Sequence, residues 1–481
     1  MKNHFFTMQV NDQHFIFDYY NLLFIQMDEE IHNCLEHYLN HEEPVRSLDD
    51  IKKSSLEPIY EDISTLLENK LMISDINLSC EIMKNYKKAY FSFPTIHKCN
   101  LACKYCFAES GENYDGLNPV MDSSMIEQIY RFVLCYNDFQ SCEQFRLDFV
   151  SGGEPLLNFD MIKEARRIGD TVFKEHGKSL DIWVCSNGIL LNNEKAYYLN
   201  KHNIGLGVSL DGPKDVNDMF RVFSDNKSSY DQVLNHLSNI IHNTSYNNYF
   251  RDVWMLTVVT AQTKSLVEIM EHHKNLGVRN IQMKIVRSSE ENNFALNHKN
   301  TEHFIGLYTE LVDFLIRKVQ EENDISYLKM ILNGNDYMGK IIIRLILRDA
   351  AVYRCMAGRN KLSFAANGDI YPCDSFVGKA EFKLGNIFDG VDEKKVDAFY
   401  DMLIFNRSAC KNCWANIICG GDCYYNSYLK NSDIKEPDRA FCVVNQKLCL
   451  LSIKLVAYLS FNKPELFERL YQYLTRRKVF Q

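Results

Sequence analysis

The spacing of apolar residues predicts a small mixed module over residues 1–80. Short alternating stretches predict strands, and an Asp that precedes an apolar stripe predicts the start of a helix. Three strands and then three helical segments are expected, at Phe5–Val10, His14–Asp18, Leu22–Met27, Asp28–Tyr38, Leu48–Ser54 and Glu57–Met72. Three short strands combined with three helices are typical of a winged-helix-like domain.

A different pattern runs over residues 88–300, where short apolar strands alternate with helical segments. The strands are expected at Ala89–Phe93, Phe145–Ser151, Ile182–Ser186, Gly205–Leu210, Val253–Val259 and Ile281–Val286. The helices are expected at Met121–Tyr136, Asp160–His176, Glu194–His202, Tyr230–His242 and Lys264–Leu276. This α/β alternation predicts a parallel sheet with helices outside, either a partial barrel or a doubly wound sheet. In both folds the chemistry lies at the carboxyl ends of the strands.

The rest of the chain divides by composition. Residues 301–352 are expected to form a helical linker, and 449–481 a C-terminal helical segment. Between them, residues 353–448 are rich in cysteine, poor in strands and without clear apolar periodicity. That combination is typical of a domain that bound metal holds together.

Composition narrows the class of protein. The 481 residues are 46% hydrophobic and 24% charged, which is an ordinary globular balance. A net charge of −9 gives no general attraction to nucleic acid or to an anionic membrane, so neither is an expected partner. No uninterrupted run of about 18 apolar residues predicts a membrane span, and the N-terminus lacks the features of a signal peptide. We therefore expect a cytoplasmic protein, in which the 16 cysteines bind metal or do redox chemistry.

Cys99, Cys103 and Cys106 follow the first expected barrel strand with the spacing C-x3-C-x2-C. Three thiolates on one tight loop can bind three irons of a [4Fe–4S] cluster, which leaves the fourth iron open for chemistry. A zinc loop that lacks one ligand, or a set of buried thiols, are the alternatives.

The triad resembles the motif of the radical S-adenosylmethionine (SAM) enzymes, in which the open iron chelates the amino and carboxylate groups of SAM. Tyr105 takes the aromatic position that lies against the adenine in that family. Further family motifs follow at the ends of the next strands. The GGEP motif begins with Gly152, Gly153 and Glu154, and a variant of the TNG motif contains Ser186 and Asn187. A Ser and an Arg near the fourth strand follow, at Ser209 and Arg221.

The resemblance implies a fold, cofactor contacts and a reaction. The fold is a partial (β/α)6 TIM barrel. Glu154 would accept from the SAM ammonium, Ser186 and Asn187 would approach the ribose, and Ser209 and Arg221 would contact the SAM carboxylate. The sixth strand would give the adenine an apolar wall. Reductive cleavage of SAM would give a 5′-deoxyadenosyl radical, which abstracts hydrogen from an unactivated C–H bond.

A second cysteine group resembles the SPASM domain, which carries two auxiliary [4Fe–4S] clusters and would bring the total to three. The resemblance assigns Cys355, Cys373 and Cys423 to the nearer cluster. It assigns four cysteines to the farther cluster, namely Cys410, Cys413, Cys419 and Cys442. Some relatives have an eighth cysteine just upstream, and residues 344–354 contain none here. The nearer cluster would then have a free iron, and the alternative for the region is a pair of zinc sites.

Asp374 directly follows Cys373. In some SPASM relatives an aspartate at this place takes a proton from the substrate, so the resemblance makes Asp374 a candidate catalytic residue. A polar turn is the alternative interpretation.

The domain order resembles radical SAM maturases of ribosomally made peptides, of the sactipeptide and ranthipeptide thioether-forming type. This implies a precursor peptide whose leader adds to the edge of the N-terminal sheet, and an electron donor such as flavodoxin or ferredoxin. Carbon–carbon or carbon–oxygen crosslinking and formylglycine formation, as in anaerobic sulfatase maturation, are the alternative reactions. A zinc-stabilised DNA-binding regulator is the non-enzyme alternative, although residues 1–80 show no concentrated basic face.

Overall fold

The computed structural model of the protein describes residues 5–10, 13–19, 22–27, 29, 32, 86–108, 120–150 and 152–477. The three helices expected between 28 and 72 lie outside these residues, apart from Glu29 and His32.

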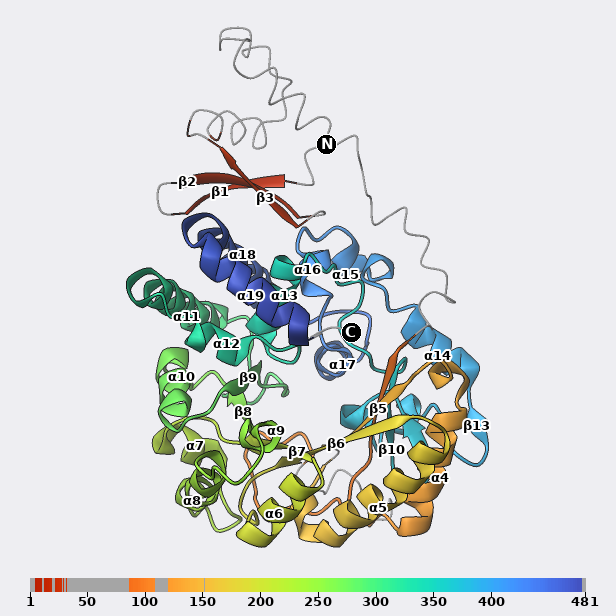
Figure 1. The fold of residues 1–481 in the computed structure, drawn as a ribbon. Helices are drawn as coiled ribbons and strands as arrows, with labels where there is room; N and C mark the ends of the chain where they lie inside the picture. The colour runs from red at the N-terminus through yellow and green to blue at the C-terminus, as the bar shows by residue number, and fades with distance from the viewer. Residues whose placement is uncertain are drawn as a thin grey trace.

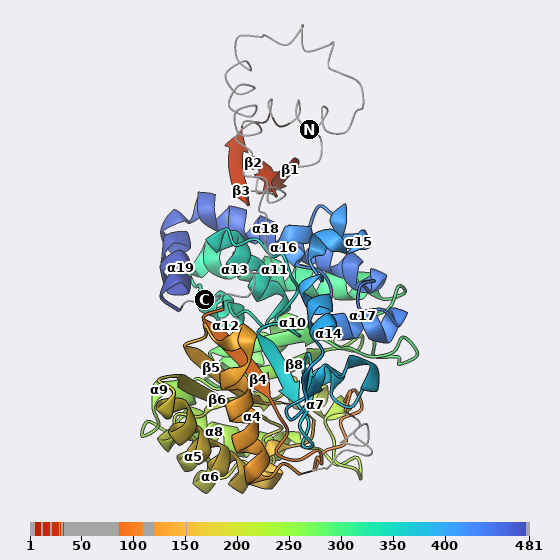
Figure 2. The same ribbon diagram turned by 90° about the vertical axis from the view of Figure 1, so that its right-hand side faces the viewer.

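The N-terminal module contains the three expected strands, β1 (Phe5–Val10), β2 (Gln13–Asp18) and β3 (Leu23–Met27). They pair antiparallel in the order β1-β2-β3. The ring of Phe15 on β2 is fully buried and lies 4.7 Å from that of Phe461 in helix α18 (Arg439–Asn462). The small sheet therefore packs on a C-terminal helix, at one end of the molecule (Figures 1 and 2).

A ten-stranded sheet forms the centre of the protein, in the order β13-β12-β11-β10-β4-β5-β6-β7-β8-β9. Its six-stranded core follows chain order and is parallel throughout. These strands are β4 (Lys88–Ser92), β5 (Gln144–Phe149), β6 (Ser179–Ser186), β7 (Gly205–Ser209), β8 (Trp254–Val259) and β9 (Asn280–Ile285). A doubly wound sheet reverses its strand order at a switch point, and the six parallel strands from β4 to β9 do not. Because the order never reverses, the core is a partial barrel.

Helices cover the outer face of the barrel, as Figure 1 shows for the arc from α4 to α10. The barrel helices are α4 (Ser123–Cys135), α5 (Phe159–Glu175), α6 (Asn193–Lys201), α7 (Lys214–Phe220), α8 (Tyr230–Ile241), α9 (Asn248–Arg251) and α10 (Leu266–Asn275). Several begin at a capping side chain: Asp122, Asn192 and Ser265 each accept from the backbone N–H three residues on. Each long helix buries one apolar stripe against the sheet.

A second helical layer follows the barrel and packs around α18. It contains α11 (Thr301–Glu322), α12 (Ser326–Ile331), α13 (Tyr337–Leu347) and α19 (Pro464–Arg477). Helix α18 is long and apolar enough to cross a membrane by composition alone, but 67% of its most apolar window is buried within the protein. It contacts α11 and α13, which is the arrangement of a core helix. It also begins at Arg439 and runs without a break through residues 448 and 449, where the sequence predicts the boundary between the cysteine-rich segment and the C-terminal helical segment.

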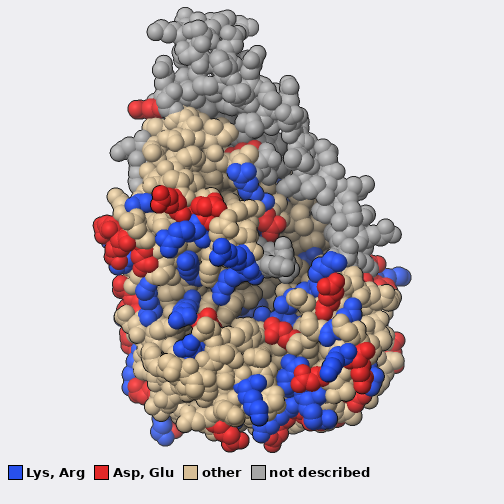
Figure 3. All heavy atoms as spheres, viewed as in Figure 1, with Lys and Arg blue, Asp and Glu red and all other residues tan. Residues whose placement is uncertain are grey.

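The cysteine-rich segment extends the central sheet. Its short elements are β10 (Lys361–Phe364), β11 (Asp369–Tyr371), β12 (Gly385–Asn386), β13 (Gly390–Val391), α14 (Glu393–Tyr400), α15 (Ser408–Lys411), α16 (Asn416–Cys419) and α17 (Tyr424–Asn431). Strand β10 pairs parallel with β4, and the hydroxyls of Ser363 and Ser92 lie 2.6 Å apart. The segment is thereby joined to the barrel edge. Figure 3 shows acidic and basic side chains interspersed on one face of the molecule.

Candidate functional site

The first cysteine loop is held against the segment that follows α7. The N–H of Ala102 donates to the carbonyl of Val222 at 2.8 Å, and that of Lys104 to the carbonyl of Phe220 at 3.0 Å. The three thiols face one another within electrostatic range. Burial raises the pKa of Cys103 to about 11. Arg221 opposes this rise, and Cys106 and Cys99 contribute to it. Three neighbouring half-buried thiols suit a cationic centre, because bound iron stabilises the thiolate form. The donor set therefore fits an iron–sulfur cluster.

The GGEP turn lies directly behind this loop. Gly152 and Gly153 both have φ of +70°. A Cβ on Gly153 would lie 2.3 Å from the Ile96 carbonyl oxygen and 2.6 Å from that of Lys98. The N–H of Glu154 donates to the same Lys98 carbonyl at 2.8 Å. The glycines therefore allow two backbone segments to touch, and this contact positions the cysteine loop.

The Glu154 side chain joins the second and third barrel strands. Its carboxylate is buried and accepts from the Ser186 hydroxyl at 2.8 Å, the Asn187 N–H at 2.7 Å and the Leu156 N–H at 3.0 Å. Burial raises the pKa of Glu154, and these hydrogen bonds oppose the rise. A carboxylate has about four acceptor positions, so a further donor such as an ammonium can still bind.

Asn187 connects Glu154 and Ser186 to the cysteine loop. Its amide donates to the Asn100 side chain at 2.7 Å and lies 3.6 Å from the Cys99 sulfur. The variant TNG motif thus touches the cysteine loop. Asn100 is a contact that the sequence analysis missed, although it lies inside the cysteine motif itself.

Tyr105 and Arg221 meet in a buried chain of hydrogen bonds. Arg221 donates to the Tyr105 hydroxyl at 2.8 Å, and that hydroxyl donates to Asp211 at 2.5 Å. The Val258 N–H donates to the same carboxylate at 3.0 Å. Asp211 was not singled out from the sequence, although it lies two residues after Ser209, which is half-buried at the end of β7.

The Tyr105 ring belongs to an apolar cluster on the inner side of the barrel. Phe220, Val286 and Phe294 form the buried centre of this cluster, and Val258 packs against it. Val286 directly follows β9, so the sixth strand leads into an apolar residue beside Tyr105. An apolar residue at this place suits the role that the family resemblance implies for the sixth strand, which is to form an apolar wall against the adenine of SAM.

The remaining motif cysteines fall into two electrostatic groups. Cys373 interacts with Cys423 and Cys355. In the other group, Cys442 interacts with the remaining three, Cys419, Cys410 and Cys413. The SPASM resemblance assigns the same sets of three and four, and their role as cluster ligands stays a prediction.

N–H groups surround the sulfurs of the larger set. Asn445 and Gln446 of α18 donate to the sulfurs of Cys419 and Cys413 at 2.8 and 3.3 Å. The Gly421 N–H donates to Cys419 at 3.3 Å. Such donors favour thiolate ligands and tune the potential of a bound cluster.

Asp374 lies beside the smaller set and is paired. The Lys361 ammonium lies 2.7 Å from its carboxylate. Burial acts to raise the pKa of Asp374, but Lys361 and Arg287 outweigh it and hold the pKa below its usual value. Arg287 also donates to the hydroxyl of Ser375 at 3.1 Å and lies 3.6 Å from the Cys423 sulfur. As placed, Asp374 is the anion of an ion pair.

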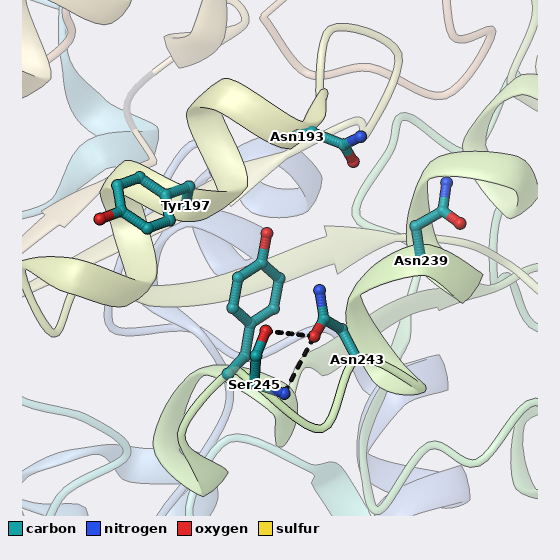
Figure 4. Close-up of a pocket in the computed structure, with 6 residues that line it drawn as sticks. Asn193, Tyr197, Asn239, Asn243 and Ser245 are labelled. Carbon is teal, nitrogen blue, oxygen red and sulfur yellow. Dashed lines mark hydrogen bonds between the residues drawn. The ribbon is translucent and has the colours of Figure 1, made fainter.

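A separate hollow of about 470 Å³ opens on the outer surface near α6 and α8 (Figure 4). It is lined by amides, hydroxyls and two tyrosines, at Asn193, Tyr197, Asn239, Asn243, Ser245 and Tyr246. Ser245 donates to Asn243 through its N–H at 3.0 Å and through its hydroxyl. None of the candidate cofactor residues lines this hollow.

Comparison with known families decides between iron and zinc. Residues 93–250 match the radical SAM superfamily, and residues 355–414 match the SPASM iron–sulfur cluster-binding domain. The chain is a radical SAM enzyme with a SPASM domain. Its cofactors are SAM and [4Fe–4S] clusters, in the number typical of SPASM proteins. The zinc interpretations of both cysteine groups, and with them the zinc-stabilised regulator, are therefore wrong.

This radical SAM enzyme is similar to several sulfatase-maturating enzymes. It is 25% identical over 353 residues to a cysteine-type anaerobic sulfatase-maturating enzyme of Clostridium novyi, covering 69% of this chain and 87% of the relative. It is 25% identical over 362 residues to a serine-type enzyme of Bacteroides thetaiotaomicron, covering 70% and 82%. The solved structure of native anSMEcpe with bound AdoMet has a TM-score of 0.62 at 18% identity, covering 78% of this chain and all of that one. The last similarity concerns the fold.

Proposed function

We propose that this radical SAM enzyme modifies a ribosomally made precursor peptide by joining a cysteine sulfur to a carbon of another residue. The observation that carries the proposal is the unequal size of the two SPASM cysteine groups. Four thiols complete the ligand shell of one cluster, whereas three leave one iron of the other without a cysteine. A peptide thiolate is the chemical match for that iron.

The reaction removes one hydrogen atom from carbon and one proton from sulfur, and it releases one electron beyond those in the new bond. When bound at the first cluster, SAM would supply the radical group that abstracts the hydrogen atom. Glu154 and Arg221 supply an anion and a cation for its ammonium and carboxylate. The ion-paired Asp374 and Lys361 lie beside the smaller cysteine group, where they would orient the peptide thiolate. The surplus electron would pass to an auxiliary cluster.

The N-terminal sheet supports a peptide substrate. In the described residues it has three strands and two unpaired edges, at β1 and β3. An exposed strand edge binds an extended peptide through backbone hydrogen bonds. We assign the leader of the precursor to one of these edges.

Formylglycine formation is the second candidate, because several relatives are sulfatase-maturating enzymes. It also uses hydrogen abstraction followed by loss of one electron. It needs no open auxiliary iron, since the substrate carbon becomes an aldehyde carbon and forms no new link. With a cysteine substrate, water supplies the aldehyde oxygen and the sulfur leaves as sulfide. The three-thiol group therefore favours thioether formation.

The test uses anaerobically reconstituted enzyme and a short cysteine-containing peptide encoded next to it. We expect a product that lacks two hydrogen atoms and whose cysteine resists alkylation, with about twelve irons per chain. The variant with Cys99, Cys103 and Cys106 changed to Ala should form no 5′-deoxyadenosine and keep the auxiliary clusters. An aldehyde in the product, detected by hydrazide labelling, would favour formylglycine formation and contradict the proposal.

A further inference from the structure

An ammonium group lies on the inner face of the barrel, next to the apolar cluster around Tyr105. Lys284 of β9 is paired in register with Val258 of β8. In a parallel sheet, paired residues point to the same side. Val258 packs on the Tyr105 cluster, and Val286, two residues after Lys284, is part of it. Lys284 therefore borders the place where the resemblance puts the SAM adenine.

The other neighbours of Lys284 come from both the barrel and the SPASM segment. It interacts electrostatically with Arg287 and Cys185 of the barrel, and with Asp374 and Lys361 of the SPASM segment. Lys284 therefore lies between the candidate SAM site and the smaller cysteine group. A peptide carbon that loses a hydrogen atom at the SAM site and then bonds to sulfur at the auxiliary cluster has to occupy this interval.

Charge in this interval is unbalanced. Asp374 is already paired with Lys361, and Arg287 is directed at Ser375 and Cys423. The Lys284 side chain is exposed and makes no hydrogen bond or ion pair with any residue in the described part of the chain. Lys284 also interacts electrostatically with the buried carboxyl group of Asp336. Three cations therefore face two carboxyl groups, and a further anion would be stabilised here.

On the basis of the proposed function, we propose that Lys284 binds a carboxylate of the peptide close to the reacting carbon. A backbone carbonyl would accept a hydrogen bond from Lys284 but would not offset the excess positive charge. The carboxylate belongs either to an acidic side chain or to the carboxyl terminus of the peptide. Lys284 would then select acidic peptide segments for modification.

The test measures binding of three capped hexapeptides, each with one cysteine, to reconstituted enzyme saturated with SAM. The first contains one aspartate, the second has asparagine instead, and the third is the asparagine peptide with a free carboxyl terminus. We expect a carboxylate to improve the dissociation constant about tenfold over the asparagine peptide. The improvement should disappear in Lys284→Met and largely return in Lys284→Arg. Whether the first or the third peptide gains identifies the source of the carboxylate.

Lys264→Met removes an exposed lysine just before α10 and is the matched control, expected to keep the tenfold preference. Unchanged preference in Lys284→Met, or equal binding of all three peptides to the unmodified enzyme, would overturn the inference and leave the proposed function intact. A loss of SAM affinity larger than the loss of peptide affinity would place Lys284 in the SAM site and also overturn it. If none of the peptides and no full-length precursor binds, the proposed function fails, and this inference fails with it.

Discussion

Single residues at the catalytic loop act mainly by connecting one motif to the next. Gly153 allows the GGEP turn to touch the backbone behind the cysteines, and Glu154 joins that turn to Ser186 and Asn187. The family resemblance predicted these motifs, because each is a short run of residues on one loop at the end of a strand. The partners of Asp374 and Tyr105 were not predictable in this way. Lys361 and Asp211 are brought to them by the fold, and no local pattern marks either residue.

Changing Gly153 to Ala tests the contact between the two loops. Alanine disfavours a φ of +70°, and its Cβ would overlap two backbone carbonyl oxygens. We expect the cysteine loop to be displaced and the first cluster lost, so that iron falls by about a third, or roughly four of twelve atoms per chain. Iron analysis and 5′-deoxyadenosine assays measure the effect.

Gly306→Ala is the matched control, because nothing lies within 4 Å of a Cβ at that position in α11. It should keep full iron and activity and gain about 0.5–1 kcal/mol of helix stability. Full iron and normal SAM cleavage in Gly153→Ala would show that the loop contact is not needed.

At the scale of elements, the six barrel strands lie within a few residues of the predicted ranges. Apolar runs flanked by turn residues define such strands well. One strand and the start of one helix were not predicted. Strand β10 has only four residues, and it pairs with β4 across a large sequence separation. Helix α18 begins at Arg439, ten residues before the predicted helical segment at 449–481. This start was missed because the helix is buried on many sides and so lacks the single apolar stripe that marks a helix.

The start of α13 gives a prediction about pH. Asp336 caps this helix by accepting from Gly339 at 2.7 Å, and it also accepts from Met283 of β9 at 2.7 Å. Burial raises its pKa to about 7, against about 3.9 in an unfolded chain. Between these values the folded chain keeps a proton that the unfolded chain has lost. The contribution of Asp336 to the free energy of unfolding therefore falls as the pH rises from about 4 to 7.

Asp336→Asn cannot ionise and keeps an acceptor for the helix N-terminus. Relative to the unmodified protein, its free energy of unfolding should increase by about 2–3 kcal/mol between pH 5 and pH 7 and level off above pH 8. Anaerobic urea unfolding of both proteins at several pH values measures this difference. Parallel stability profiles would show that Asp336 is ionised across the whole range.

At the scale of the whole molecule, the N-terminal sheet packs on the C-terminal helix α18 through Phe15 and Phe461. The sequence predicted the three strands but not this contact, since the two rings lie at opposite ends of the chain. Helix α18 also carries Cys442 and two donors to cluster sulfurs, Asn445 and Gln446. The proposed leader-binding module and the farther cluster site therefore share one rigid support.

Phe461→Ala tests whether this contact positions the leader. Loss of the ring should loosen the N-terminal sheet, so we expect KM for a full-length precursor to rise about tenfold, equivalent to about 1.4 kcal/mol. A leaderless peptide should be processed as before, because the barrel is unchanged. Steady-state kinetics with both peptides measure the difference. Phe388→Ala, which removes a ring that is 63% exposed, is the control, and an equal rise in KM for both peptides would contradict a role in leader binding.

The pairing of β10 with β4 has a consequence for how a modification site is chosen. One continuous backbone ladder connects the strand that leads into the first cysteine loop with the hairpin that leads into Cys373 and Asp374. The separation between the two redox centres is thus built into the sheet and cannot adapt to different substrates by domain movement. The distance between the two cluster sites should therefore be the same for every substrate. Precursors whose two linked residues are spaced differently in sequence should bend the intervening peptide to match that fixed distance.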